Sequence, residues 1–302
     1  MYQGQYHGKT KHHVDLAAVV ARAKDVGVEK MLITGTSLSE SRAALKLAKQ
    51  FDIHCTAGVH PTSTSELDTH ASGSEGYLQE LSALIQEDRG ESGSKRIISV
   101  GEIGLDYDRL HHSPRETQLR YLPALLRLSK TFALPLFLHS RHPEAHVDLI
   151  RILKEVGWGD KGEGWHGGVV HSFTGSMAEM TELVEMGLHI GINGCGLKTE
   201  GNLSVVKEIP LDKLLLETDA PWCTPSSTHA SFPLLPEIPV VNKVSKPQSW
   251  KEGMGVKSRF EPAEVVTIAH VVAKVKGISV EELAERAWEN SIRLFWPEEA
   301  TR

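Results

Sequence analysis

Acidic and histidine side chains recur near the ends of short apolar segments of this chain. They are His60 in segment 54–60, Glu102 in 97–106, His139 in 134–140, His171 in 168–173, and Glu217 and Asp219 in 214–220. Carboxylate oxygens and imidazole nitrogens are ligands of divalent cations, and the same groups transfer protons. Brought together, these residues predict a hydrolytic site built around metal ions.

Their positions follow if the apolar segments are β-strands, in which alternate residues share a face. In segment 97–106, Val100, Glu102 and Asp106 have the same parity, and in 134–140 His139 follows Phe137 on one face. Each set is apolar early and ionisable late, so the ionisable groups are expected at one end of a sheet, facing inward. Carboxylates crowded there repel one another and lose hydration, and a divalent cation removes that cost.

The order of elements predicts an α/β barrel. Seven strand-like segments can be identified, at 31–36, 54–60, 97–106, 134–140, 168–173, 189–193 and 214–220. Helix-like stretches lie at 15–26, 41–50, 76–87, 116–131, 145–156, 177–186 and 283–294. Strands separated by helices form parallel sheets through right-handed crossovers, and 302 residues suit one barrel domain over residues 1–302. Barrel enzymes place their sites at the carboxyl ends of the strands.

Composition limits the classes of protein to consider. No apolar run is long enough to span a membrane, and the first residues lack the pattern of a secretory signal. Three widely spaced cysteines favour a reducing compartment. We therefore expect a cytoplasmic or nuclear protein, with no obligate protein partner evident.

A nucleic-acid partner requires local positive charge, because the net charge of the chain is −6. The segment 240–260 carries five cations and one acid, a net charge of +4. Trp250 lies among these cations and is suited to stacking on a base. The candidate DNA contacts are Lys243, Lys246, Trp250 and Lys251. A solvated surface loop is the competing interpretation.

Each candidate residue also has a structural interpretation. A single inward histidine at a strand end is more often a hydrogen-bonded core residue than a ligand, and Glu102 alone could be a buried ion-pair partner. The case depends on all of them occupying the same end of successive strands. Other histidines, His12, His13, His111, His112 and His146, fall on helices or loops and are expected at the surface.

Five ordered motifs resemble the TatD deoxyribonucleases. They are GVHP at 58–61, GEIGLD at 101–106, LHSR at 138–141, VHSF at 170–173 and ETDAPW at 217–222. GCGLKT at 194–199 and STHA at 227–230 are similar to the eukaryotic branch of that family. The resemblance runs from about residue 6 to residue 296.

The resemblance implies a (β/α)8 TIM barrel of amidohydrolase type and metal-assisted hydrolysis of DNA phosphodiesters, often as a 3′→5′ exonuclease. Glu102 would bridge two metal ions, and His139 and His171 would hold one of them. Asp219 would bind the other and accept a proton from the attacking water. The remaining matched residues, His60, Glu217 and Arg141, would contact the substrate phosphate or orient the residues that bind the metal ions.

The chain departs from the family pattern at its amino terminus. Members open with a strand that carries a metal-binding pair, whereas this sequence begins after that point and lacks a recognisable first strand. We expect either a truncated sequence or a protein without that strand. This leaves one of the two metal positions open. The cofactor is expected to be one or two divalent ions, with Mg²⁺ first and Mn²⁺ or Zn²⁺ as alternatives.

Two other functions remain open. Because fold does not determine substrate, a hydrolase of cyclic amides, lactones or aminoacyl esters would use the same scaffold. An inactive homologue that binds partners is the second alternative, and its support is the absent first strand. A substrate panel distinguishes the first alternative, and metal content distinguishes the second.

Overall fold

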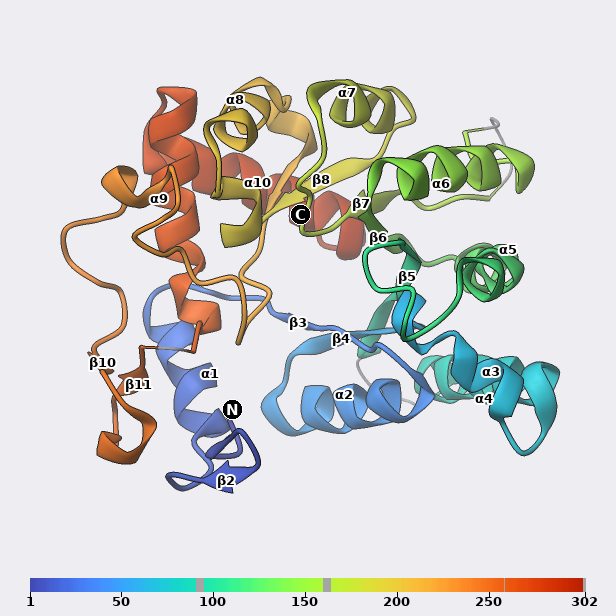
Figure 1. Ribbon diagram of the computed structural model, residues 1–302, viewed down its shortest axis with the longest axis horizontal. Helices are drawn as coiled ribbons and strands as arrows, with labels where there is room; N and C mark the ends of the chain where they lie inside the picture. The colour runs from blue at the N-terminus through green and yellow to red at the C-terminus, as the bar shows by residue number, and fades with distance from the viewer. Residues whose placement is uncertain (91–94, 160–163, 258, 301–302) are drawn as a thin grey trace. The chain divides into compact units, whose positions relative to one another are not determined.

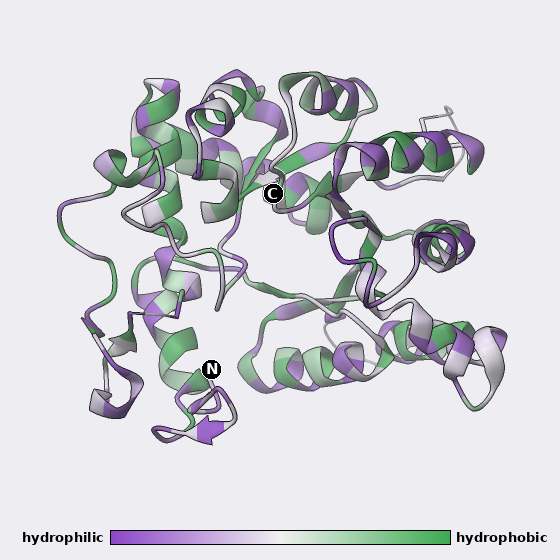
Figure 2. Ribbon diagram, in the orientation of Figure 1, coloured by the Kyte–Doolittle hydropathy of each residue, from purple (hydrophilic) through white to green (hydrophobic). Residues whose placement is uncertain are grey.

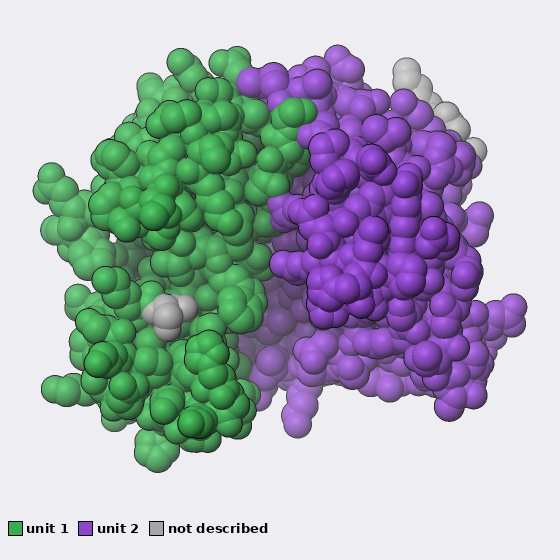
Figure 3. Space-filling model, viewed as in Figure 1, with its two compact units in different colours: residues 1–29, 172–176, 191–290 green, residues 30–171, 177–190, 291–302 purple. Residues whose placement is uncertain are grey.

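A computed structural model describes residues 1–90, 95–159, 164–257 and 259–300, and these form two compact units (Figure 3). Unit 1 consists of residues 1–29, 172–176 and 191–290, and unit 2 of residues 30–171, 177–190 and 291–302. Both units are built from separate stretches of chain. The division of the chain into a single domain stays a prediction.

One parallel sheet contains the expected strands in sequence order. Its seven strands within the described residues are β3 (Leu32–Ile33), β4 (His54–Ala57), β5 (Ile97–Asp106), β6 (Leu136–Arg141), β7 (Gly168–Val170), β8 (His189–Ile192) and β9 (Leu214–Leu216). The pairs from β3 to β8 are parallel and lie in unit 2. Helices connect the successive strands (Figure 1). The strands are apolar because helices cover a parallel sheet.

Unit 2 also contains the helices between these strands. They are α2 (Leu38–Phe51), α3 (Ser65–Thr69), α4 (Gly73–Gly90), α5 (Arg115–Phe132), α6 (Pro143–Glu155) and α7 (Met177–Glu185). Figure 2 shows hydrophobic and hydrophilic residues alternating along them. In α6, for example, Leu149, Ile152 and Leu153 are buried while Arg151 is exposed. Burial of one apolar face is the main stabilising contribution to such helices.

Unit 1 combines an amino-terminal segment with the last third of the chain. Its elements are β1 (Gln5–Tyr6), β2 (Lys9–Thr10), α1 (Leu16–Asp25), α8 (Glu200–Glu208), β10 (Lys243–Val244), β11 (Gly255–Val256) and α9 (Val265–Lys276), with α10 (Val280–Phe295) up to Asn290. β1 pairs with β2 in an antiparallel hairpin, and β10 pairs with β11 in parallel. Ser279 caps α10 by accepting the backbone N–H of Glu282 at 3.0 Å.

The structure differs from the expected elements in three respects. Most strands end earlier than expected, so His60, His171 and Asp219 lie in the loops that follow β4, β7 and β9. The helices α3 and α8 were not expected, because their short apolar patterns are weak. His146 is not at the surface: it is buried on α6 and its Nε2 lies 3.0 Å from Glu182 Oε2.

No helix in the described part of the chain is both long enough and apolar enough to cross a membrane.

Candidate metal centre

The position of Glu102 depends on an irregularity in β5. Every residue of this strand is buried, and its register against β6 shifts between Gly101 and Ile103, so Glu102 interrupts the alternation. Gly104 then pairs with His139. A Cβ atom on Gly104 would lie 2.0 Å from the His139 carbonyl oxygen, and φ at Gly104 is +144°. Only glycine allows β5 and β6 to approach this closely.

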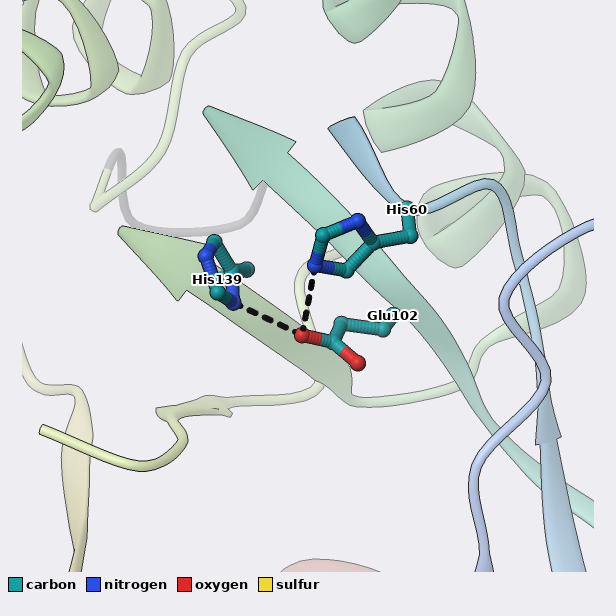
Figure 4. Close-up of side chains that lie close together, drawn as sticks. All are labelled: His60, Glu102 and His139. Carbon is teal, nitrogen blue, oxygen red and sulfur yellow. Dashed lines mark hydrogen bonds and ion pairs between the residues drawn. The ribbon is translucent and has the colours of Figure 1, made fainter. Parts of the chain in front are cut away.

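Three imidazoles converge on one oxygen of Glu102. His139 Nδ1 and His171 Nε2 each lie 2.7 Å from Glu102 Oε1, and His60 Nε2 lies 3.3 Å from it. Figure 4 shows His60 and His139 pointing toward the carboxylate. All four side chains are buried, and His60, Glu102 and His139 form a group that could hold a metal ion.

The imidazoles determine the charge of the buried acid. Burial by itself would raise the pKa of Glu102. The charge of His171 and the hydrogen bonds from His139, His171 and His60 outweigh burial and hold that pKa well below its usual value. Glu102 is therefore a carboxylate at neutral pH, as a metal ligand must be.

The hydrogen bonds of His60 identify its tautomer. The backbone N–H of Thr62 donates to His60 Nδ1 at 3.1 Å, so Nδ1 carries no proton. The proton is then on Nε2, which faces Glu102 at 3.3 Å. A histidine that binds a metal through one nitrogen donates a proton from the other. In this geometry the nitrogen of His60 that faces Glu102 carries the proton, so His60 would have to give up that proton to bind a cation together with Glu102 and His139.

Asp106 is the last residue of β5 and also lies at the site. It was not among the predicted site residues. Its Oδ2 lies 3.3 Å from His139 Nε2, without hydrogen-bond geometry, and that nitrogen is buried with no hydrogen-bond partner in the described chain. Gln118 holds the backbone N–H and carbonyl of Asp106 at 2.8 and 2.9 Å. A buried nitrogen without a hydrogen-bond partner is costly, which fits a site that takes a cation.

Comparison with known proteins identifies the family. A family model described as TatD related DNase matches residues 6–296. The chain belongs to this family. It is 44% identical to the deoxyribonuclease Tat-D of Schizosaccharomyces pombe over 98% of this chain and 92% of that one. It is 35% identical to the 3′-5′ ssDNA/RNA exonuclease TatD of Erwinia amylovora over 95% of each chain.

Solved structures of TatD relatives agree with this assignment. An uncharacterized amidohydrolase from Saccharomyces cerevisiae has a TM-score of 0.88 at 33% identity and covers 98% of this chain and 96% of that chain. A TatD family hydrolase from Entamoeba histolytica gives the same TM-score and identity over 98% and 94%. The expected family and α/β fold of amidohydrolase type are confirmed, and the chain belongs to a family of hydrolases that act on ester bonds.

The two acids of the ETDAPW motif of this TatD protein belong to unit 1. Glu217 Oε1 accepts the backbone N–H of Ser172, the residue after His171, at 2.7 Å. Asp219 is exposed and adopts a φ of +52°, and its Oδ2 accepts the thiol of Cys223 at 3.3 Å. The contact with Cys195 and burial are the main reasons that the pKa of Cys223 is raised, and Asp219 adds to the shift.

Segment 240–260 has fewer positively charged side chains available to bind a polyanion than its composition suggests. Lys243 Nζ lies 2.6 Å from Glu264 Oε2, and the side chain is largely buried. Lys246 and Lys251 are exposed. Trp250 stacks on His12 with ring centroids 4.8 Å apart, so His12 is not a free surface histidine.

Arg141 ends β6, in register with Asp106, and its carbonyl accepts the backbone N–H of Tyr107 at 3.1 Å. Its position is therefore fixed by the same strand pair that carries Glu102 and His139.

Proposed function

We propose that this TatD protein is a metal-dependent deoxyribonuclease that removes nucleotides from the 3′ end of DNA. The convergence of His60, His139 and His171 on the buried carboxylate of Glu102 is the observation that carries the proposal. The names of its relatives, deoxyribonuclease Tat-D and 3′-5′ ssDNA/RNA exonuclease TatD, support the choice of substrate over amides, lactones or aminoacyl esters.

In this proposal Glu102, His139 and His171 hold one or two divalent ions, with Mg²⁺ expected first and Mn²⁺ or Zn²⁺ as alternatives. A bound divalent ion would polarise the phosphodiester and make water more acidic. Glu102 contributes the negative charge that retains a cation, and His139 and His171 fix its position.

Two further residues act on the substrate. His60 donates the proton on Nε2 to a phosphate oxygen, a role for which its tautomer is set by Thr62. Asp219 accepts the proton of the attacking water, as its motif and its exposed carboxylate support. Glu217 holds the backbone after His171, and so acts through another residue.

The test is the removal of charge at constant shape. Glu102→Gln and Asp219→Asn are compared with the parent on a 5′-labelled single-stranded oligonucleotide with a free 3′ end, in Mg²⁺ and in Mn²⁺. We expect each variant to lose about 10²-fold or more of the cleavage rate, the usual contribution of such groups. The parent should yield a ladder that shortens from the 3′ end and should stop when that end is blocked.

Matched controls are Glu87→Gln in unit 2 and Asp212→Asn in unit 1, two exposed acids outside the proposed site. They should cleave at the parent rate. Chelation should abolish cleavage, and a single added metal should restore it. Parent-like rates in Glu102→Gln would overturn the proposal, and hydrolysis of a lactone or aminoacyl ester without cleavage of DNA would favour the alternative hydrolase.

A further inference from the structure

Two of the three cysteines lie side by side in unit 1. Cys195 belongs to the 3-10 turn η2 (Gly194–Leu197) after β8, and Cys223 follows the ETDAPW motif. Their Sγ atoms are 2.7 Å apart, and both are free thiols in partly exposed side chains. The third, Cys55, is fully buried in β4 of unit 2. The chain therefore contains one adjacent thiol pair and one isolated thiol.

The backbone holds the pair together. Asn193 Oδ1 accepts the backbone N–H of Cys195 at 2.8 Å, which orders the turn. The segment of Cys223 packs so closely on this turn that a Cβ atom on Gly194 would lie 1.9 Å from the Cys223 carbonyl oxygen. A disulfide requires sulfurs about 2.0 Å apart. At 2.7 Å the two Sγ atoms are already close to that bonding distance.

One sulfur of the pair also contacts the proposed proton acceptor. The thiol of Cys223 donates to Asp219 Oδ2 at 3.3 Å, and four residues separate the two in sequence. A disulfide has no S–H, so oxidation removes this hydrogen bond. It also turns Sγ of Cys223 toward Cys195. Oxidation of the pair therefore removes one of the contacts that position the Asp219 carboxylate.

We propose that Cys195 and Cys223 are a modification site, at which a reversible disulfide lowers the activity of the protein by displacing the Asp219 carboxylate. Formation of the disulfide stands on the geometry of unit 1 alone, whereas its effect on activity rests on the proposed function. Reversible disulfides of this kind serve redox sensing in proteins kept in reducing surroundings.

The oxidant is a small-molecule disulfide such as oxidised glutathione. One cysteine attacks a glutathione sulfur, so that a mixed disulfide forms and one glutathione leaves as its thiol. The second cysteine attacks the protein sulfur of the mixed disulfide, which forms the Cys195–Cys223 bond and releases the second glutathione thiol. Two electrons pass from the cysteines to glutathione, and the two cysteine protons end on the two released thiols.

The experiment treats the metal-loaded full chain with oxidised glutathione and then with dithiothreitol. Free thiols are counted under denaturing conditions, and peptide mass spectrometry locates the cross-link. Nuclease activity is measured on single-stranded DNA. We expect three free thiols to fall to one, with Cys195 linked to Cys223. Cleavage should fall about tenfold or more, because a displaced general base loses much of its contribution, and should return on reduction.

Two variants distinguish the effect of the Cys195–Cys223 disulfide from the effect of oxidation elsewhere in the chain. Cys223→Ser removes the disulfide and any mixed disulfide beside Asp219, while the serine hydroxyl can still donate to Asp219, so its activity should resist oxidised glutathione. Cys55→Ser keeps the pair and should respond like the parent. The proposal that the disulfide forms is overturned if the parent keeps three free thiols or links other cysteines. Peptide mapping of the parent decides this without any variant.

The regulatory effect is overturned if the cross-linked parent keeps its full activity, or if Cys223→Ser loses activity to the same extent. If neither the reduced nor the oxidised parent cleaves DNA, the proposed nuclease function fails. In that case the thiol count still decides whether the disulfide forms.

Discussion

Glu102 shows how a few contacts determine the state of one side chain. A carboxylate buried alone would take up a proton, because burial penalises the charged form. Three imidazole nitrogens within 3.3 Å of Oε1 reverse that preference. The residues arrive from separate loops and strands, so none of these contacts is local in sequence. The acid is kept charged by groups that can also bind a cation.

At the same scale, the tautomer of His60 predicts opposite effects for two amides. The side-chain nitrogen of glutamine can occupy the place of Nε2, whereas that of asparagine mimics Nδ1. We expect His60→Gln to keep part of the cleavage rate and His60→Asn to lose about 10²-fold, because only glutamine retains the donor. Metal affinity should stay near that of the parent in both variants. A large loss of metal affinity in both would show that His60 is a ligand instead.

A second prediction at this scale concerns pH and stability. Burial, together with the charges of Arg96 and Lys30, lowers the pKa of His54 from 6.5 to about 4. Its Nε2 accepts the indole N–H of Trp296 at 3.3 Å, which requires the neutral ring. Protonation thus favours the unfolded chain, so this contribution to the free energy of unfolding is complete above pH 6.5 and declines as pH falls toward 4.

Because His54 is only partly buried, we expect a loss of about 1–2 kcal/mol, less than its full pKa shift implies. Urea unfolding of the parent and of His54→Gln between pH 7 and pH 4 gives the measurement. The difference in unfolding free energy between the two should shrink toward acid pH. A constant difference would contradict the lowered pKa.

At the scale of elements, the β5–β6 pair sets the geometry of the site. The β5 strand shifts register at Glu102 and approaches β6 closely at Gly104. Together these two features place the Glu102 carboxylate of β5 beside the His139 ring of β6. Bulges of this type re-aim a side chain at the end of a sheet. Gly104 of the GEIGLD motif is therefore required by the close approach of β5 to β6, apart from its place in a family pattern.

Gly104→Ala tests this arrangement. A methyl group 2.0 Å from the His139 carbonyl, at a φ of +144°, must push β6 away from β5. We expect the free energy of unfolding to fall by about 1–3 kcal/mol and the affinity for Mn²⁺, measured by calorimetry, to fall with it. The control is Gly90→Ala, where a Cβ atom meets nothing within 4 Å. A variant with normal Mn²⁺ affinity would show that the strand spacing does not position His139.

At the scale of the whole molecule, a buried ionic network joins distant parts of unit 1. Arg259 is fully buried and pairs with both oxygens of Asp15 at 2.8 and 2.7 Å and with Glu261 at 2.7 Å. Arg22 of α1 binds the same Glu261 at 2.8 Å. Buried ion pairs therefore connect the amino-terminal segment with Arg259 and Glu261.

Arg259→Met should destabilise the protein by about 3–5 kcal/mol, because it removes the cation that pairs with buried Asp15 and one of the two cations that pair with Glu261. The measurement is urea unfolding at neutral pH. Lys251→Met, an exposed cation of the same segment, should change the free energy of unfolding by less than about 0.5 kcal/mol. Equal stability of Arg259→Met and the parent would contradict the assignment of Arg259 to the folded interior.

Ion pairs explain why the charge count over segment 240–260 overstates the number of cations available to a partner. A count of charges treats every lysine and arginine as available to a partner. Lys243 instead forms an ion pair with Glu264, and Arg259 forms ion pairs with Asp15 and Glu261. Glu261 and Glu264 lie just after the counted segment and Asp15 lies near the amino terminus, so the count over 240–260 includes none of the three acids. Lys246 and Lys251 stay candidates for DNA contact.

The sequence by itself determined the strand order, most of the helices between the strands and the ionisable residues near the ends of five strand segments. These depend on alternation of apolar and polar residues and on short motifs, which are local properties of a chain. Segment 97–106, expected as a strand, is β5 without any change of its limits.

Only the tertiary structure decided which atoms meet. The register shift at Glu102, the tautomer of His60, the contact of Asp106 with His139 and the pairing of Cys195 with Cys223 all join residues that are far apart in the chain or depend on loop packing. The physical reason is that periodicity specifies the face on which a side chain lies, whereas distances of 3 Å depend on how strands and loops are packed against one another.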